Sequence, residues 1–222
     1  MGDCFNTEAK KRHNYFLSQM TKKNAEVKKN HRIILIGTGE SGKSTFVKQM
    51  KLLSNRNQTF DDQYKMKFKP ELQRNLIQAL GAMLEFMDLQ KQDFRNSTSA
   101  LKKYKSKIYN IKAEIDINPD CITQYAESKD LNERNTFYQM CKDVWSDDNV
   151  KEIYKRSNEY HIIDCAQYVL DKIDEIREPD YKPSEFDVLQ CRTKTLGIHT
   201  EIINYNNVTF ELVDVGGQRE QR

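Results

Sequence analysis

Residues 37–45 read Gly37-Thr38-Gly39-Glu40-Ser41-Gly42-Lys43-Ser44-Thr45 and match the pattern G-x-x-x-x-G-K-[ST]. The apolar run before them, Ile33-Ile34-Leu35-Ile36, is typical of a buried strand in a parallel sheet. The residues after them, Phe46 to Leu53, can continue as a helix. This order of strand, glycine-rich turn and helix start predicts a binding site for the phosphates of a nucleotide.

The residue types in this loop suit a dense negative charge. A helix N-terminus offers unpaired backbone N–H groups and the positive end of the helix dipole. Gly37 and Gly42 let the backbone approach the phosphates closely, Lys43 supplies a positive charge, and the Ser44 hydroxyl can ligate Mg²⁺. The alternative is a chance match in a surface turn, against which the preceding strand and the following helix argue.

A second motif lies far downstream. Residues 209–213 read as a strand that runs into Asp214-Val215-Gly216-Gly217-Gln218. The Asp214 carboxylate can hold Mg²⁺ through water, the glycine pair can bring a backbone N–H to the γ-phosphate, and Gln218 can orient an attacking water. By itself this motif would be interpreted as a plain turn, but together with the phosphate loop it favours nucleotide chemistry.

The segment 187–198, which lies between these motifs, contributes two candidate residues. Arg192 can neutralise charge that develops on phosphoryl oxygens, and Thr195 can be a second hydroxyl ligand of Mg²⁺. Taken alone, the segment would be interpreted as a solvated basic loop followed by a strand.

At these three motifs the chain resembles the alpha subunits of heterotrimeric G proteins. Trp145-Ser146-Asp147, residues 156–160 and Asp164-Cys165-Ala166 are similar to that family's helical-domain signature, so the resemblance covers essentially the whole chain. It implies an α/β P-loop NTPase fold, Ras-like and incomplete, with an inserted all-α helical domain. The expected domains are an N-terminal amphipathic helix (1–31), a partial GTPase domain (32–54 and 186–222) and the helical insert (55–185).

The resemblance also implies the roles of single residues. Arg192 is the built-in arginine finger, paired with Glu40 in the inactive site; Gln218 positions the attacking water, and Gly217 senses the γ-phosphate. Ser44 and Thr195 ligate Mg²⁺, and Asp214 does so through water. At Cys165 the family usually has Ser, so a hydroxyl hydrogen bond is expected to be lost there. The implied nucleotide-binding residues are Gly37, Glu40, Ser41, Gly42, Lys43, Ser44, Thr45, Asp164, Cys165, Leu189, Gln190, Cys191, Arg192, Thr195, Asp214, Val215, Gly216, Gly217 and Gln218.

The function that the resemblance implies is a GTP-hydrolysing switch that binds GTP and GDP and couples membrane receptors to effectors. Its implied partners are a G-protein beta-gamma dimer, a G-protein-coupled receptor and an effector. The sequence ends at Arg222, before the family's Asn-Lys-x-Asp loop that recognises guanine, so an alternative is a non-enzymatic fragment that sequesters beta-gamma without GTP. A P-loop kinase or ATPase is a third hypothesis, against which the Asp-Val-Gly-Gly-Gln motif argues.

Two expectations concern packing. The nucleotide domain should contain strands near 32–37, 199–205 and 208–214, and a parallel sheet needs helices on both faces. We therefore expect an exposed apolar sheet face and edge. The insert should be helical, because Leu72, Leu76, Leu80, Leu84 and Met87 recur at helical spacing after Pro70, and residues 133–144 and 158–176 continue the pattern.

Composition excludes several classes of protein. A net charge of +3 over 222 residues is too small to predict nucleic-acid binding. Five cysteines, odd in number and without C-x-x-C spacing, predict a reduced cytosolic setting and no zinc site. No apolar run approaches the length needed to span a membrane, and no secretory signal is visible.

The N-terminus predicts attachment to a membrane surface. Gly2 is a myristoylation candidate, although Asn6 stands where that motif prefers Ser or Thr, and Cys4 is a palmitoylation candidate. Residues 1–32 carry eight Lys/Arg against three acidic residues. An acyl chain next to a basic segment suits an anionic membrane, so we expect a lipid-anchored protein at the cytoplasmic face of the plasma membrane.

Overall fold

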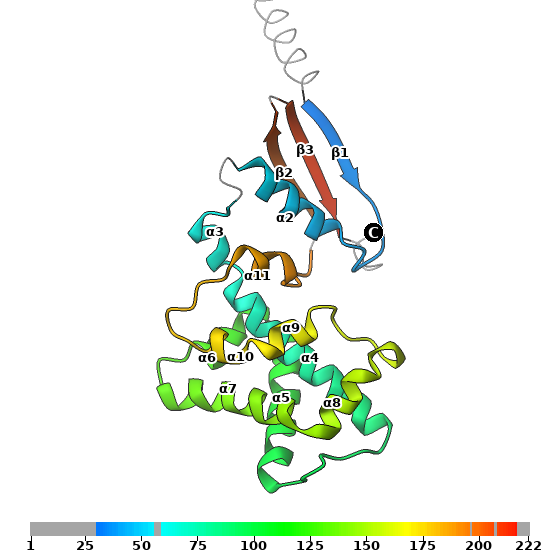
Figure 1. The fold of residues 1–222 in the computed structure, drawn as a ribbon, viewed down its shortest axis with the longest axis vertical. Coiled ribbons are helices and arrows are strands. Elements are labelled where there is room, and N and C mark those ends of the chain that lie inside the picture. The colour runs from blue at the N-terminus through cyan, green and yellow to red at the C-terminus, as the bar shows by residue number, and fades with distance from the viewer. Residues whose placement is uncertain (1–29, 56–58, 196, 207, 217–222) are drawn as a thin grey trace, which may run out of the picture. The chain divides into compact units, whose positions relative to one another are not determined.

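The computed structural model describes residues 30–55, 59–195, 197–206 and 208–216 (Figure 1). The chain divides into two compact units. One, the sheet unit, takes its described residues from 1–58 and 194–222, and the other, the helical unit, is formed by residues 59–193.

The sheet unit contains three strands and one helix among its described residues. The strands are β1 (Asn30–Leu35), β2 (Ile198–Tyr205) and β3 (Val208–Val215), in the spatial order β1-β3-β2, and the helix is α2 (Lys43–Ser54). All three lie close to the predicted strand ranges, which are thereby confirmed. β3, in the centre, carries its carboxyl end to the same edge of the sheet as β1.

The sheet, which was treated as parallel when its cover by helices was considered, is mixed. β1 runs parallel to β3, but β2 is antiparallel to it. The reason is the short connection between β2 and β3: a parallel crossover needs a dozen or more residues, whereas two residues suffice for a hairpin. Asn206 in this connection has φ 49°, a left-handed conformation that asparagine tolerates.

The two faces of the sheet differ. Leu212 of β3 and Ile203 of β2 are buried on the face against which α2 packs, and Lys51 of α2 binds Glu201 of β2 there at 3.1 Å. On the opposite face Ile34 is 55% exposed and Ile202 is 68% exposed. The predicted exposed apolar face is confirmed within the described residues.

The helical unit is built around one long central helix, α4 (Lys69–Leu89), against which α5 to α10 pack (Figure 1). The predicted stripe is confirmed, since its five residues Leu72, Leu76, Leu80, Leu84 and Met87 are all fully buried. The other helices are α3 (Asp62–Met66), α5 (Ser99–Ile117), α6 (Ile122–Ala126), α7 (Leu131–Ser146), α8 (Asp148–Lys155), α9 (Ala166–Asp171), α10 (Ile173–Ile176) and α11 (Glu185–Gln190), with short 3₁₀ turns at Pro119–Cys121 and Ser157–Glu159.

A continuous helix over 158–176 is wrong. After the 3₁₀ turn Ser157–Glu159 the backbone is extended at Tyr160 (φ −146°, ψ 166°), and α-helix resumes only at Ala166. Tyr160 stacks on Phe86 of α4 with ring centroids 4.5 Å apart, and its hydroxyl donates to the Ile153 carbonyl at 3.3 Å. These tertiary contacts favour the extended conformation over local helix propensity.

Several expectations fall on residues that lie outside the described part of the chain. They are Gly2, Cys4, Gly217, Gln218 and the predicted N-terminal helix, apart from residues 30 and 31, which belong to β1. None of the described helices is both long and apolar enough to cross a bilayer.

Candidate functional site

The predicted phosphate loop joins the end of β1 to the start of α2. Gly42, the residue before the helix, has φ 82°, a conformation that favours glycine, and the Phe46 N–H donates to its carbonyl at 2.9 Å. Glu40 also has a positive φ, 65°. A Cβ on Gly37 would lie 2.6 Å from Ser41 Oγ, so a side chain there would force the Ser41 hydroxyl to move. The glycines at both ends of the motif thus have a steric reason.

Lys43 folds back over this loop. Its ammonium nitrogen donates to the Gly37 carbonyl at 3.2 Å, to the Thr38 carbonyl at 2.5 Å and to Ser41 Oγ at 3.3 Å. The positive charge therefore lies inside the turn, beside the N-terminus of α2. This is the end of the helix whose dipole and free N–H groups favour an anion. Thr45, the last residue of the motif, is exposed in the first turn of α2.

Three oxygen-bearing side chains meet next to the loop, although they are distant in sequence. Ser44 Oγ lies 2.7 Å from Thr195 Oγ1 and donates to Asp214 Oδ2 at 2.5 Å. Thr195 Oγ1 lies 3.4 Å from the same carboxylate oxygen. We call Ser44, Thr195 and Asp214 the hydroxyl–carboxylate cluster. It unites residues from α2, from the segment before β2 and from β3.

The chemistry of this cluster fits a magnesium ion. Mg²⁺ prefers hard oxygen ligands and is usually held by one or two carboxylates together with waters and phosphates. Asp214 is buried, and its Oδ1 has no hydrogen-bond partner among the described residues. A buried carboxylate oxygen with an unused lone pair is suited to accept a bond from a metal-bound water. No group of three or more His, Cys, Asp or Glu residues that could hold a metal occurs in the described ranges.

The strand end after Asp214 is held against the segment before β2. Gly216 N–H donates to the Gly197 carbonyl at 3.0 Å, and Gly197 has φ 72°. Val215 is the last residue of β3. The backbone that leads toward Gly217 and Gln218 is thus fixed at its start.

The remaining predicted residues belong to the helical unit and gather around α11. Leu189 and Gln190 end this helix, and Cys191 caps it, with its N–H donating to the Asp187 carbonyl at 2.8 Å. Cys165 precedes α9 and is buried, whereas Asp164 before it is exposed.

Asp187 fixes the first turn of α11. It forms a capping box with Ser184 and accepts hydrogen bonds from Lys172 Nζ at 2.8 Å and from the Tyr168 hydroxyl at 2.6 Å. Burial alone would raise the pKa of this carboxyl, but the hydrogen bonds from Lys172, Tyr168 and Ser184 outweigh it and lower the pKa to about 2. Burial lowers the pKa of Lys172, but the hydrogen bonds of its ammonium group to Asp187 and Glu175 outweigh this effect and raise the pKa.

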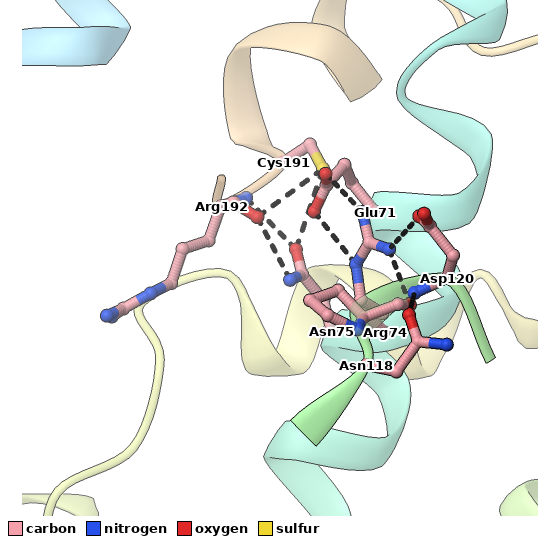
Figure 2. A network of polar contacts seen from close by, with 8 residues as sticks. Glu71, Arg74, Asn75, Asn118, Asp120, Cys191 and Arg192 are labelled. Atoms are coloured by element: carbon pink, nitrogen blue, oxygen red, sulfur yellow. Dashed lines mark hydrogen bonds and ion pairs between the residues drawn. The ribbon is translucent and has the colours of Figure 1, made fainter. Parts of the chain in front are cut away.

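Asn75 holds the other end of this segment (Figure 2). Its Nδ2 donates to the Arg192 carbonyl at 3.1 Å, and its Oδ1 accepts from the Arg192 N–H at 3.0 Å. The thiols of Cys165 and Cys191 are directed at the same Oδ1, at 3.4 and 3.6 Å. Burial raises the pKa of the Cys165 thiol. We expected that Cys165, which stands where the family usually has Ser, would lose a hydroxyl hydrogen bond. Its thiol instead forms a sulfur hydrogen bond to Asn75.

Sequence analysis missed Asn75 and Asp187. Asn75 had a detectable signal: it follows Leu72 by three positions and so lies on the apolar stripe of α4, where a polar residue is unusual. Asp187 had another, since Ser184 and Asp187 match the capping-box spacing. Of the predicted site residues, the structure brings the described ones together in two sets, one in each unit.

Comparison with known proteins identifies what the chain resembles. The family model described as "G-protein alpha subunit" matches residues 10–222. The chain is 34% identical over 224 residues to a guanine nucleotide-binding protein G(s) subunit alpha of Drosophila pseudoobscura pseudoobscura, with 97% of this chain and 53% of the relative covered.

Two further relatives give the same picture. A G(s) subunit alpha of Schistosoma mansoni is 36% identical over 206 residues, with 93% of this chain and 50% of the relative covered. The G(olf) subunit alpha of Homo sapiens is 34% identical over 204 residues, with 92% and 49% covered. The chain spans about half the length of the curated relatives that it matches.

Proposed function

Because the chain belongs to the family of G-protein alpha subunits, we propose that it binds GTP and GDP together with Mg²⁺ and hydrolyses GTP. The observation that carries this proposal is the meeting of Ser44, Thr195 and Asp214 beside the phosphate loop. Three motifs that are far apart in the sequence supply these residues, and a phosphate site with a magnesium ion needs all three.

The phosphate loop supplies the binding energy. The backbone N–H groups of residues 40–45 would donate to the phosphate oxygens, and Lys43 would exchange its contacts with the loop carbonyls for contacts with the terminal phosphates. Each exchanged contact would then join two opposite charges, which is stronger than a bond from the ammonium group to a neutral carbonyl.

The hydroxyl–carboxylate cluster would hold the metal. The hydroxyls of Ser44 and Thr195 would be direct ligands, and Asp214 would act through water. When bound, Mg²⁺ would neutralise negative charge on the phosphate oxygens. The contacts among the three side chains already place their oxygens within a few ångströms of one another, so little rearrangement is needed.

Arg192 and Gln218 would carry the hydrolytic step. Arg192 would stabilise charge that develops on the transferred phosphoryl group, and Gln218 would orient the attacking water. Only two residues separate Arg192 from Thr195 along the chain, so the arginine cannot lie far from the metal ligand. The pairing of Arg192 with Glu40 in an inactive state is part of the proposal.

The helical unit would be the family's inserted domain, with Asp164, Cys165 and residues 189–191 flanking the nucleotide. We further propose the partners that this family implies: a beta-gamma dimer, a receptor and an effector. Lipid attachment at Gly2 or Cys4, and with it a position at the cytoplasmic face of the plasma membrane, belongs to the same proposal.

The test is equilibrium binding of a fluorescent, non-hydrolysable GTP analogue to the purified chain with Mg²⁺, competed with GTP and with ATP. We expect binding that GTP displaces and ATP does not. Lys43→Ala should abolish it, because the terminal phosphates lose their charge partner, whereas Lys51→Ala in the same helix should preserve it.

Other outcomes distinguish the alternatives. Displacement by ATP in preference to GTP would point to a P-loop kinase or ATPase. No binding by a folded sample would contradict the proposal and leave the non-enzymatic hypothesis, which capture of a beta-gamma dimer by the same sample would then support.

A further inference from the structure

The amide of Asn75 is matched to the backbone of a single residue, Arg192. Its two ends engage the two backbone groups of Arg192, with Nδ2 on the carbonyl at 3.1 Å and Oδ1 on the N–H at 3.0 Å. This pairing fixes the orientation of the amide. In the reverse orientation, the amide NH₂ would face the Arg192 N–H and the amide oxygen would face the Arg192 carbonyl. Asn75 is only 1% exposed, so bulk water hardly reaches the Asn75 side of either bond.

The surroundings of the amide oxygen leave it fully used. Besides the Arg192 N–H, it accepts contacts from the thiols of Cys165 and Cys191, which come from the start of α9 and the end of α11. Asn75 therefore joins three segments: its own helix α4, the residue before α9, and the segment that leaves α11. Removing its side chain would take away the donor to the Arg192 carbonyl and the amide acceptor of the Arg192 N–H.

The helix turn that carries Asn75 is itself anchored. The neighbouring Arg74 donates to Glu71 at 3.1 Å and to the Pro119 carbonyl at 2.7 Å, which ties α4 to the turn after α5 (Figure 2). Leu72 and Leu76, on either side, are fully buried. Asn75 is thus a rigid support, since its backbone cannot shift without disturbing these contacts.

The support acts on the backbone of Arg192 and not on its guanidinium. In Figure 2 the Arg192 side chain extends away from Asn75 and from the polar network around it. The peptide is fixed while the long side chain reaches outward. An arrangement of this kind restricts where the guanidinium can be placed, because the side-chain torsions begin from a fixed Cα.

We propose that Asn75 is a positioning residue for GTP hydrolysis, which acts by holding the backbone of Arg192. This inference rests on the proposed function. An arginine finger stabilises charge in the transition state, so its misplacement slows hydrolysis without weakening the binding of nucleotide, to which the phosphate loop contributes most. A misplacement of about 1 Å can cost about a hundredfold in rate.

The experiment is a double-mutant cycle in the full 222-residue chain. Single-turnover hydrolysis of bound GTP is measured for the wild type, Asn75→Leu, Arg192→Ala and the double variant, together with the affinity for the non-hydrolysable analogue. We expect Asn75→Leu to slow hydrolysis about ten- to a hundredfold with unchanged affinity. The double variant should be no slower than Arg192→Ala alone, because both substitutions remove the same contribution.

Gln73→Leu is the matched control. Gln73 is a fully buried amide in the same helix, but its Nε2 donates to the Tyr138 hydroxyl at 3.0 Å and to Glu127 at 3.3 Å. It should lower stability by a similar amount and leave hydrolysis unchanged. If Asn75→Leu does not fold, Asn75→Ser takes its place, since it shortens the side chain without adding bulk.

A second readout does not need nucleotide. Hydrogen exchange at the Arg192 amide should become at least tenfold faster in Asn75→Leu and stay unchanged in Gln73→Leu, because only the former loses the acceptor of that N–H.

Three results would overturn the inference. If Asn75→Leu slowed hydrolysis equally in the wild type and in the Arg192→Ala variant, its effect would be a general structural one. Slowing by Gln73→Leu to the same extent would show that any buried amide of α4 matters equally. Unchanged exchange at Arg192 would show that the hydrogen bond is not formed. By contrast, a wild-type chain that binds but does not hydrolyse GTP would contradict the proposed hydrolysis itself, and the inference would fall with it.

Discussion

The two units differ in how completely they bury their apolar residues. In the helical unit, α4 is surrounded by its neighbours and its five stripe residues are fully buried. In the sheet unit, α2 covers one face of the sheet within the described residues, while Ile34 and Ile202 on the other face are more than half exposed. Apolar burial is the dominant stabilising contribution in folding. The helical unit should therefore be the more stable of the two.

The difference matters for the site because each unit holds one half of the proposed machinery. The phosphate loop and the hydroxyl–carboxylate cluster belong to the less buried unit, and the Asn75–Arg192 contact belongs to the unit with the buried α4 core. We therefore predict that the helical unit holds the proposed catalytic arginine rigidly. The sheet unit would hold the phosphates on a more exposed support. Two substitutions in the helical unit test this comparison, in order of expected effect.

Leu80→Ala should have the largest effect. Leu80 is fully buried in the middle of α4, so the loss of its side chain leaves a cavity and lowers the free energy of unfolding by about 3 kcal/mol. Urea unfolding followed by the fluorescence of Trp145, the single tryptophan, reports on the helical unit to which it belongs.

Two controls define the comparison. Leu89→Ala, on the same helix but 77% exposed, should change the unfolding free energy by less than about 0.5 kcal/mol. Ile34→Ala on the open sheet face should be similarly mild when unfolding is followed by circular dichroism. If Leu80→Ala were as mild as either control, the difference in packing would not be a difference in stability.

Asp187→Asn should have a smaller effect that depends on pH. Because the folded pKa of Asp187 lies below its ordinary value, at about 2, its stabilisation is complete above about pH 4 and is lost as the pH falls towards 2. The variant should be about 2 kcal/mol less stable than the wild type at pH 7. Urea unfolding between pH 7 and pH 2 should show the two proteins converging in acid. A difference that stayed constant with pH would contradict the role of the Lys172–Asp187 pair.

Local patterns in the sequence predicted much of the fold. The strand, loop and helix around residues 37–45 follow from the glycines and the apolar run, and the buried face of α4 follows from leucines at helical spacing. Such features depend on residues a few positions apart. The exposed sheet face was also predicted, because the number of helices can be compared with the faces that a sheet must cover.

One error overlooked a local feature, and the other depends on a long-range contact. The direction of β2 depends on the length of the connection to β3, which was overlooked when the sheet was assumed to be parallel. The extended backbone at Tyr160 depends on Phe86, a residue far away in the sequence. For the site, the motifs predicted that Ser44, Thr195 and Asp214 would act together, but no local pattern linked Asn75 to Arg192, which are 117 residues apart.

The most direct test of the central claim, that the hydroxyl–carboxylate cluster forms a magnesium–nucleotide site, is the Mg²⁺ dependence of GTP-analogue affinity. The measurement compares the wild type with Ser44→Ala and with Ser54→Ala, a control at the far end of α2 whose hydroxyl donates to the Lys51 carbonyl at 2.8 Å. We predict that Mg²⁺ strengthens binding by the wild type and by Ser54→Ala, and that this gain disappears in Ser44→Ala. An equal gain in all three proteins, or none in the wild type, would contradict the account.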